Sequence, residues 1–397
     1  MIDEWRKLPI NARRLIIYYS ISTIPLVGDI FLPLYLYTRG WELIEVGFLL
    51  SFGFVMEIVG SILIGYLFDK GFQPKIAMFI IDFVSGVIHL IYAVAEQPKQ
   101  IYLAYSIWGF LAPLSVAYQT IEKEVYPETS YDVTFSLHMA FPNATQLIGM
   151  IVFGYYLTYA NPGLTGFRTF YFSTASLYFI TSLYILAKIP RTKERTTISG
   201  FTISRISKDL LPLFISEILI IFGYQIAPQF IYMNYVFNIA RFNIFMISLT
   251  LTLANIAGVI GGVITSKKAG KRKFLFPAII TLAFSYTLLY LAKFFQRIFQ
   301  VFILSCLHVF LSYLAHTIWF VYHRSLFYER VPQEHKGKIF GTLSSMRIII
   351  YTITPIISAQ IATSIDPLSN FLIATMIILT ATIPYTFVIS VNEKYQA

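Results

Sequence analysis

Long apolar runs separated by short polar segments dominate this chain. A helix that crosses a membrane needs roughly 20 mostly apolar residues, and residues 15–37, for example, hold a single acidic residue, Asp29, and no base. The pattern predicts helices over residues 14–37, 43–68, 75–95, 100–125, 133–159, 168–188, 209–235, 242–266, 274–293, 299–328, 338–362 and 368–390. The first run is too long and too aromatic for a cleaved signal peptide, so we expect it to be a retained helix.

Composition supports a membrane protein. Of the 397 residues, 57% are hydrophobic and 13% are charged, and the mean hydropathy is +0.68. Soluble domains average about 25% charged residues, so this chain has too little charge to cover a water-soluble surface. The expected fold class is an all-α membrane protein with about twelve transmembrane helices.

The net charge of +10 raises the question of a nucleic-acid partner, but the distribution of the charge argues against one. If the N-terminus is cytoplasmic and the chain crosses twelve times, 23 of the 30 Lys and Arg residues fall on the cytoplasmic side and six on the other, with Arg347 inside a helix. The positive-inside rule explains this asymmetry. We therefore expect a multi-pass protein of the cell membrane with both termini cytoplasmic.

The single cysteine, Cys306, allows neither an internal disulfide nor a cysteine-based zinc site. We expect no metal and no cofactor.

The two halves of the chain resemble each other. A basic polar segment, residues 189–208, separates an expected six-helix bundle at 1–188 from a second at 209–397. Three pairs of strings match in order at offsets of roughly 200 residues: GDIFLP with GYQIAP, GYLFDK with GVITSK, and EVYPE with ERVPQ. Internal repeats are the usual construction of secondary transporters, whose substrate lies near the midplane between the repeats.

The loop between the second and third predicted helices resembles the signature of the major facilitator superfamily, in which a Gly is followed by an Asp, a base, a Gly and further bases. The matching residues are Gly65, Asp69, Lys70 and Gly71 in the first half, and Gly262, Lys267 and Gly270 in the second, where Ser266 replaces the acid. Glu329 and Lys336 are similar to the acid and base that end the tenth helix in many members.

This resemblance implies a secondary transporter of small molecules that alternates access between two bundles. It also implies that Asp69 braces the cytoplasmic side against the helix beginning near Lys338, where an acid is favoured at the helix N-terminus. Glu329 and Lys336 would do similar work in the other half. The alternative for all of these residues is that they are ordinary interfacial anchors.

Ionisable residues inside membrane helices cost roughly 2.5–3.5 kcal/mol on insertion scales and are therefore functional candidates. Asp29 follows Gly28 in a string similar to the first helix of some drug–proton antiporters, and a carboxylate there could carry a coupled proton. Glu57 and Arg347 are expected on neighbouring helices of opposite halves and are predicted to pair in one conformation and separate in another. Alternatively, Arg347 binds an anionic group of the substrate.

Two polar stripes in the second half are further candidates. Glu217 shares a helical face with Gln225, and His316, Trp319 and His323 recur at intervals of three or four residues. They could bind substrate or relay protons, and the alternative is helix packing. Asp82 and His89, two turns apart in a helix that the family places peripherally, are interpreted as structural.

The chain contains no HExxH, GxSxG or Walker-type motif, which excludes a self-contained ATP pump and gives no support to an enzyme. We expect a monomer in contact with membrane lipids that couples a small-molecule substrate to protons, with efflux favoured. The fifth helix has Met150 and Phe153 where antiporters of the family carry Pro and Gly, which weakens the antiport interpretation. The alternatives are proton-coupled uptake of a sugar or organic acid, and a transporter-like receptor or lipid-handling protein without ion coupling.

Overall fold

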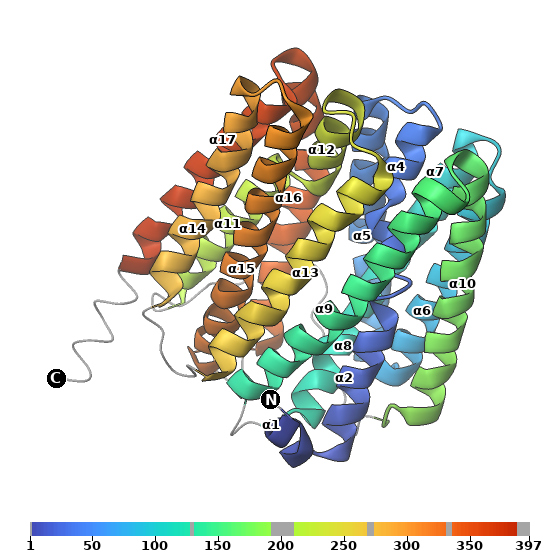
Figure 1. The fold of residues 1–397 in the computed structure, drawn as a ribbon. Helices are drawn as coiled ribbons and strands as arrows, with labels where there is room; N and C mark the ends of the chain where they lie inside the picture. The colour runs from blue at the N-terminus through green and yellow to red at the C-terminus, as the bar shows by residue number, and fades with distance from the viewer. Residues whose placement is uncertain (1, 128–130, 192–209, 268–273, 331–335, 387–397) are drawn as a thin grey trace.

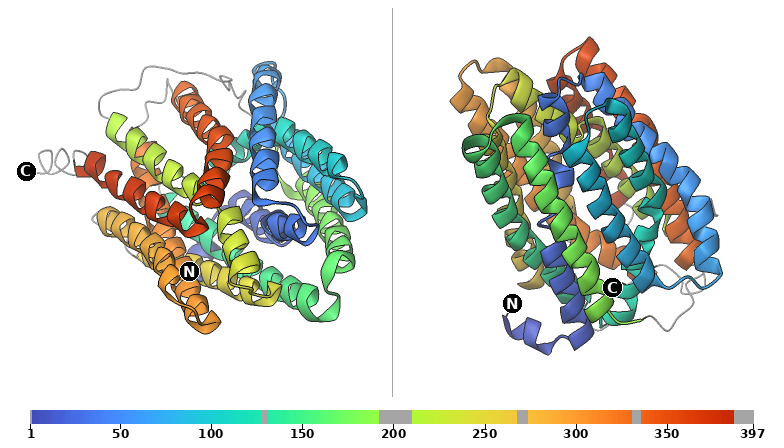
Figure 2. Two further views of the ribbon diagram at one scale, coloured as in Figure 1. Left: turned by 90° about the horizontal axis from the view of Figure 1, so that it is seen from above. Right: turned by 90° about the vertical axis from the view of Figure 1, so that its right-hand side faces the viewer.

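A computed structural model describes residues 2–127, 131–191, 210–267, 274–330 and 336–386. Every regular element in these ranges is helical, and the long helices run side by side (Figures 1 and 2). The α-helices are α1 (Ile2–Lys7), α2 (Ile10–Ser22), α3 (Val27–Ile30), α4 (Leu32–Thr38), α5 (Leu43–Asp69), α6 (Pro74–Val94), α7 (Pro98–Leu111), α8 (Val116–Val125), α9 (Tyr131–Tyr155), α10 (Gly163–Lys188), α11 (Leu211–Ile226), α12 (Gln229–Asn234), α13 (Ile244–Lys267), α14 (Leu275–Tyr290), α15 (Ile298–Arg330), α16 (Lys336–Ser364) and α17 (Pro367–Thr380).

Ten helical segments in the described ranges are long and apolar enough to cross a membrane. Two of the twelve predicted segments are not among them, for different reasons. Residues 14–37 do not form one continuous helix, and α9 carries polar residues such as His138, Asn143 and Gln146 among its apolar ones.

The prediction of an uninterrupted first helix is wrong. Between Thr23 and Leu26 the backbone hydrogen bonds tighten: Val27 N donates to Ile24 O at 3.3 Å and Gly28 N to Pro25 O at 2.9 Å. Pro25 has no N–H to donate, and the ring of Pro33 clashes with the carbonyl four residues before it, which is that of Asp29. The chain therefore carries Asp29 on the one-turn helix α3 between two irregular points.

The predicted helix at 209–235 is also interrupted, at Ala227 and Pro228, between α11 and α12. Pro228 lacks an N–H for the carbonyl of Tyr224, and the helix ends at Ile226. The carbonyl of Ile226, left without a partner in its own helix, accepts from Ser358 Oγ and from Asn370 Nδ2, both at 2.7 Å. Side chains of α16 and α17 thus supply hydrogen bonds to a backbone carbonyl that lipid could not satisfy.

Early and late helices of the chain pack against each other in two places, which we call seams. In Figure 1, α9 and α13 cross in the middle of the molecule, between the early helices on one side and the late ones on the other. A Cβ on Gly154 would lie 2.0 Å from Ser248 Oγ, and one on Gly258 would lie 2.7 Å from Asn143, so glycines allow this close approach. The second seam joins α5 to α16.

The contact between α5 and α7 depends on glycine even more strictly. A Cβ added to Gly109 would lie 2.1 Å from the carbonyl oxygen of Gly53, and the backbone would have to move to accept it. We expect Gly109→Ala to lower the free energy of unfolding by about 1–3 kcal/mol, measured by thermal or denaturant unfolding in detergent. Gly149→Ala is the control, because the nearest atom to its Cβ would be a side-chain methyl group of Val27, at 3.2 Å. Equal stabilities of the two variants would contradict this account of the seam.

Candidate functional site

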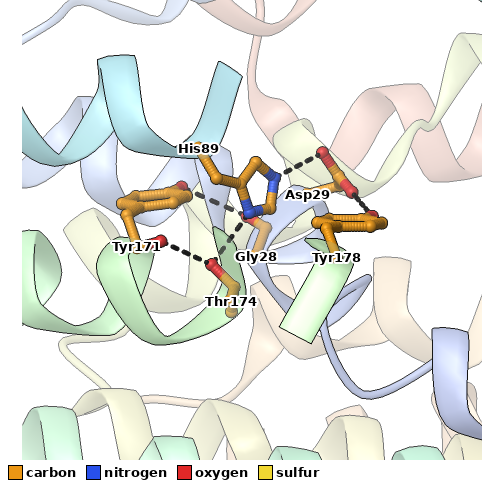
Figure 3. Close-up of polar contacts among 6 residues, drawn as sticks. All are labelled: Gly28, Asp29, His89, Tyr171, Thr174 and Tyr178. Atoms are coloured by element: carbon orange, nitrogen blue, oxygen red, sulfur yellow. Dashed lines mark hydrogen bonds and ion pairs between the residues drawn. The ribbon is translucent and has the colours of Figure 1, made fainter. Parts of the chain in front are cut away.

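Asp29 lies at the centre of a polar cluster that joins three helices (Figure 3). Its Oδ1 is 3.2 Å from Nε2 of His89 on α6, and its Oδ2 accepts a hydrogen bond from Tyr178 Oη on α10 at 2.7 Å. The other ring nitrogen of His89, Nδ1, lies 2.8 Å from Oγ1 of Thr174. The imidazole is fully buried, whereas the Asp29 side chain is 33% exposed. The carboxylate thus has one face against protein and one face open.

The irregular backbone around α3 makes room for this cluster. A Cβ on Gly28 would lie 2.4 Å from Cε1 of His89, so only glycine lets the imidazole lie across the helix. The carbonyl of Gly28 accepts a hydrogen bond from Tyr171 Oη at 3.1 Å, which ties the same turn to α10. Breaks of this kind often form the binding sites of transporters.

The hydrogen bonds of the cluster fit two arrangements of protons. In the first, the hydroxyl of Thr174 donates to the carbonyl of Tyr171 at 3.1 Å and accepts from Nδ1 of His89, and the contact between Nε2 and Oδ1 of Asp29 then needs one further proton. In the second, the hydroxyl donates to Nδ1, and Nε2–H of a neutral ring donates to Oδ1 of Asp29. In both arrangements a proton lies between the imidazole and the carboxyl group.

A second cluster lies in the later half of the chain, around Glu217 on α11. Oε2 of Glu217 is 3.0 Å from Nε2 of His323, and Oε1 accepts from the guanidinium of Arg347. Nδ1 of His323 lies 2.5 Å from Oη of Tyr385, which in turn accepts from Trp319 Nε1 at 2.9 Å. The Glu217 side chain is 2% exposed, so the carboxylate of this ion pair is almost completely buried.

The second cluster differs from the first because a cation contacts its acid. Tyr385 can donate to Nδ1 of His323, and Nε2–H can then donate to Glu217, so a neutral imidazole satisfies these three side chains. The charge of Glu217 is compensated by Arg347. The cluster needs no additional proton, and it is chemically a closed network. Of the two clusters, the one around Asp29 is the better candidate for taking up and releasing a proton.

Glu57, in the middle of α5, is half-buried and forms no hydrogen bond or ion pair within the described residues. The predicted partner Arg347 is paired with Glu217 in this structure. The ring of Tyr351, one turn after Arg347, packs with its centroid 5.2 Å from that of Phe54, one turn before Glu57. The predicted exchange of partners between conformations therefore stays a prediction.

His316 and Gln225 are both half-buried and outside the second cluster. The His316 ring stacks on Trp319 at 5.6 Å and meets Tyr224 edge-on at 5.2 Å. The predicted stripe from Glu217 to Gln225 ends two residues later, where α11 is interrupted. The structure brings together Glu217, Trp319, His323 and Arg347, but not Gln225.

The predicted gate residues are described only in part. Gly65 is buried, Lys70 is exposed with Nζ 5.4 Å from the ring of Tyr66, and Lys267 is exposed. Gly262 lies where α13 approaches α9, since a Cβ there would be 3.0 Å from the carbonyl oxygen of Ser136. Gly270 and the side chains of Asp69, Glu329 and Lys336 lie outside what the structure describes.

Gly71, the glycine that follows Lys70 in the loop motif, has a φ of +86° directly after α5. This is a left-handed conformation that glycine adopts without strain. The chain therefore turns sharply at this glycine, whose N–H donates to the carbonyl of Phe68 at 2.8 Å.

Sequence reasoning missed the partners of the chosen residues. His89 was interpreted as structural, and Tyr178, Thr174 and Tyr385 were not singled out, because the chain has 28 tyrosines and nothing local marks these. Glu122 was also missed: it accepts a hydrogen bond from Tyr19 Oη at 2.5 Å and lies 3.7 Å from Nδ1 of His138. For His89, the available signal was an imidazole within an apolar helix.

The comparisons with known proteins agree with this architecture. The model of the Major Facilitator Superfamily matches residues 15–330. This chain belongs to that superfamily, and it is a membrane transporter of small molecules rather than an enzyme.

Two solved structures are similar over almost their whole length. The human organic anion transporter MFSD10 (TETRAN) has a TM-score of 0.67 at 12% identity, with 94% of this chain and 99% of that chain covered. A single-residue mutant of the nucleoside transporter NupG has a TM-score of 0.67 at 14% identity, with 95% and 99% covered. At these identities the likeness concerns the fold. No curated protein sequence matches this chain.

Proposed function

We propose that this protein is a proton-coupled transporter that exports amphipathic organic molecules, with Asp29 and His89 as the site of the coupled proton. The observation that carries the proposal is the pair itself: a fully buried imidazole whose Nε2 lies 3.2 Å from a partly exposed carboxylate. An isolated buried charge in a membrane would be costly, and a shared proton removes most of that cost.

The two faces of Asp29 suggest how a proton and a solute compete. When an added proton is shared between Asp29 and His89, the pair is neutral overall. When it leaves, the carboxylate becomes a net negative charge with one open face, which attracts a cationic solute. Binding of the solute and binding of the proton then exclude each other, which is the condition for exchange of one for the other across the membrane.

We extend the proposal to the architecture. The chain crosses the cell membrane twelve times as two six-helix halves, 1–188 and 209–397, joined by a linker at 189–208, and both termini are cytoplasmic. The protein acts as a monomer, and the halves rock about the α9–α13 and α5–α16 seams in alternating access. The order of packing partners and the asymmetry of basic residues support this arrangement.

The two similar solved structures are an organic anion transporter and a nucleoside transporter. We infer the solute of this protein from its own site instead. Arg347 is the candidate for an anionic group, but Glu217 already neutralises it. An anion there would have to displace a buried carboxylate. The partly open carboxylate of Asp29 favours a cationic, amphipathic solute, and hence efflux over uptake of an organic acid.

Flux in proteoliposomes with an imposed pH gradient tests the proposal. The probes are tetraphenylphosphonium, p-aminohippurate and uridine, with the membrane potential clamped by potassium and valinomycin. We expect tetraphenylphosphonium to move against the proton flow and to stop when a protonophore collapses the gradient. Movement of p-aminohippurate or uridine together with protons would establish the uptake alternative. Flux that ignores the gradient would contradict proton coupling.

A further inference from the structure

Asp82 is a second buried acid in the early half of the chain, and the proposed function does not use it. Only 4% of this residue is exposed. Oδ1 lies 2.9 Å from Tyr18 Oη on α2 and 3.1 Å from Tyr118 Oη on α8, and Oδ2 lies 2.7 Å from Thr181 Oγ1 on α10. Three helices that surround α6 therefore converge on one carboxyl group.

The hydrogen bonds around Asp82 accommodate a neutral carboxylic acid. The hydroxyl of Thr181 is also placed to donate to the carbonyl of Tyr178, at 2.9 Å. If Asp82 carries a proton on Oδ2, it donates to Thr181 Oγ1, and Thr181 donates to the carbonyl of Tyr178. Oδ1 then accepts from both tyrosines, and every group is satisfied. The neutral acid fits these hydrogen bonds completely.

No compensating charge accompanies Asp82. No Lys, Arg or His forms an ion pair with it in the described part of the chain. The facing groups are the hydroxyls of Tyr18, Tyr118 and Thr181, and hydroxyls alone compensate a buried charge poorly. The neutral form is the less costly one in this conformation.

The Asp82 cluster lies directly beside the Asp29 cluster. His89 is seven residues after Asp82 on α6, about 10 Å along the helix, and Thr181 is one turn after Tyr178 on α10. The hydroxyl of Tyr178 donates to Asp29, and the backbone carbonyl of Tyr178 lies 2.9 Å from the hydroxyl of Thr181, which contacts Asp82. Tyr18 and Asp29 belong to the same irregular first span, so a movement of that span alters both clusters together.

We infer that Asp82 is a second proton-binding site of this transporter: a carboxyl group that is neutral in this conformation and loses its proton when a movement of the first span opens the cluster to water. This rests on the proposed proton coupling, and it raises the number of coupled protons that the early half can hold from one to two. The proton leaves Oδ2 for water, and the carboxylate keeps the hydroxyl donors that remain.

Infrared difference spectroscopy of the protein in lipid, between mildly alkaline and mildly acidic buffer, tests this inference without a substrate. We expect a carbonyl stretching band of a buried carboxylic acid that changes with pH, disappears in Asp82→Asn and survives in Asp3→Asn, an exposed acid of α1. Tyr18→Phe combined with Tyr118→Phe removes both donors to Oδ1 and should shift the same band to higher frequency.

The outcomes separate this inference from the proposed function. Asn reproduces the hydrogen bonds of the neutral acid, so Asp82→Asn should keep the melting temperature of the parent protein. Three results would overturn the second site. They are a failure of Asp82→Asn to fold, a carbonyl band that does not shift in the Tyr18 and Tyr118 double variant, and a carbonyl band that stays constant over the whole pH range. None of these outcomes bears on Asp29, whose own band is assigned separately with Asp29→Asn.

Discussion

Arg347→Met is expected to lower the free energy of unfolding by about 3–5 kcal/mol, the usual cost of leaving one partner of a buried ion pair uncompensated. Glu217 is 2% exposed, and its other neighbour, His323, is neutral in the arrangement that satisfies Tyr385. No other cation pairs with Glu217 within the described residues. The measurement is denaturant unfolding of the purified protein in detergent, combined with transport of the probe that proves active.

A matched pair of controls shows whether burial is the cause. The double variant Arg347→Met with Glu217→Gln removes both charges, and we expect it to regain most of the lost stability. Lys293→Met breaks the more exposed pair with Asp366, whose atoms are 3.1 Å apart, and should cost at most about 1 kcal/mol. If Arg347→Met were as stable as Lys293→Met and transported normally, the closed network around Glu217 would be irrelevant to fold and function.

Asp29→Asn is expected to reduce transport driven by a pH gradient by about two orders of magnitude, the scale on which positioned proton-transfer groups act. The amide can still accept from Tyr178 and contact His89, so the local fold should persist, but it cannot take up a proton. Exchange of labelled for unlabelled probe across the membrane, which needs no net proton movement, should continue. The measurement is gradient-driven flux and equilibrium exchange from one proteoliposome preparation.

Thr174→Val tests the part that the hydroxyl plays in holding His89. The variant removes the polar group 2.8 Å from Nδ1 of His89, so the buried imidazole loses one of its two hydrogen-bond partners and is held less firmly beside Asp29. Gradient-driven flux should fall while exchange persists, as for Asp29→Asn but less completely. Ser173→Ala is the control, because that hydroxyl is exposed and bonds only to the carbonyl of Thr169 in its own helix, at 3.0 Å. Equal flux in the Thr174 and Ser173 variants would contradict a role of Thr174 in positioning His89.

The sequence predicted most of the fold because lipid imposes a simple rule on it. Apolar runs of sufficient length become helices wherever backbone groups must be satisfied internally, and ten such segments are present. The interruptions at Pro25 and at Ala227 were not predicted. Whether a proline bends or interrupts a helix depends on partners for the freed carbonyls, and those partners, Tyr171, Ser358 and Asn370, come from distant helices.

The site was predicted residue by residue but not as a set of contacts. Asp29, Glu217, His323 and Arg347 could be chosen because an ionisable group in an apolar helix is costly. Their pairing depends on helix rotation and tertiary packing, which the sequence pattern does not contain. Hence the contact of Arg347 with Glu217 was not predicted, and His89 was interpreted as structural although its Nε2 lies 3.2 Å from Oδ1 of Asp29.

Proton movement on addition of a probe tests the central claim most directly. Proteoliposomes containing a trapped pH-sensitive dye receive tetraphenylphosphonium under a clamped membrane potential, and the internal pH is followed for the parent protein and for Asp29→Asn. The account predicts a change in internal pH that requires the probe, is opposite in direction to the movement of the probe, and is absent in Asp29→Asn. Probe flux without any pH change, or an equal pH change in both proteins, would contradict it.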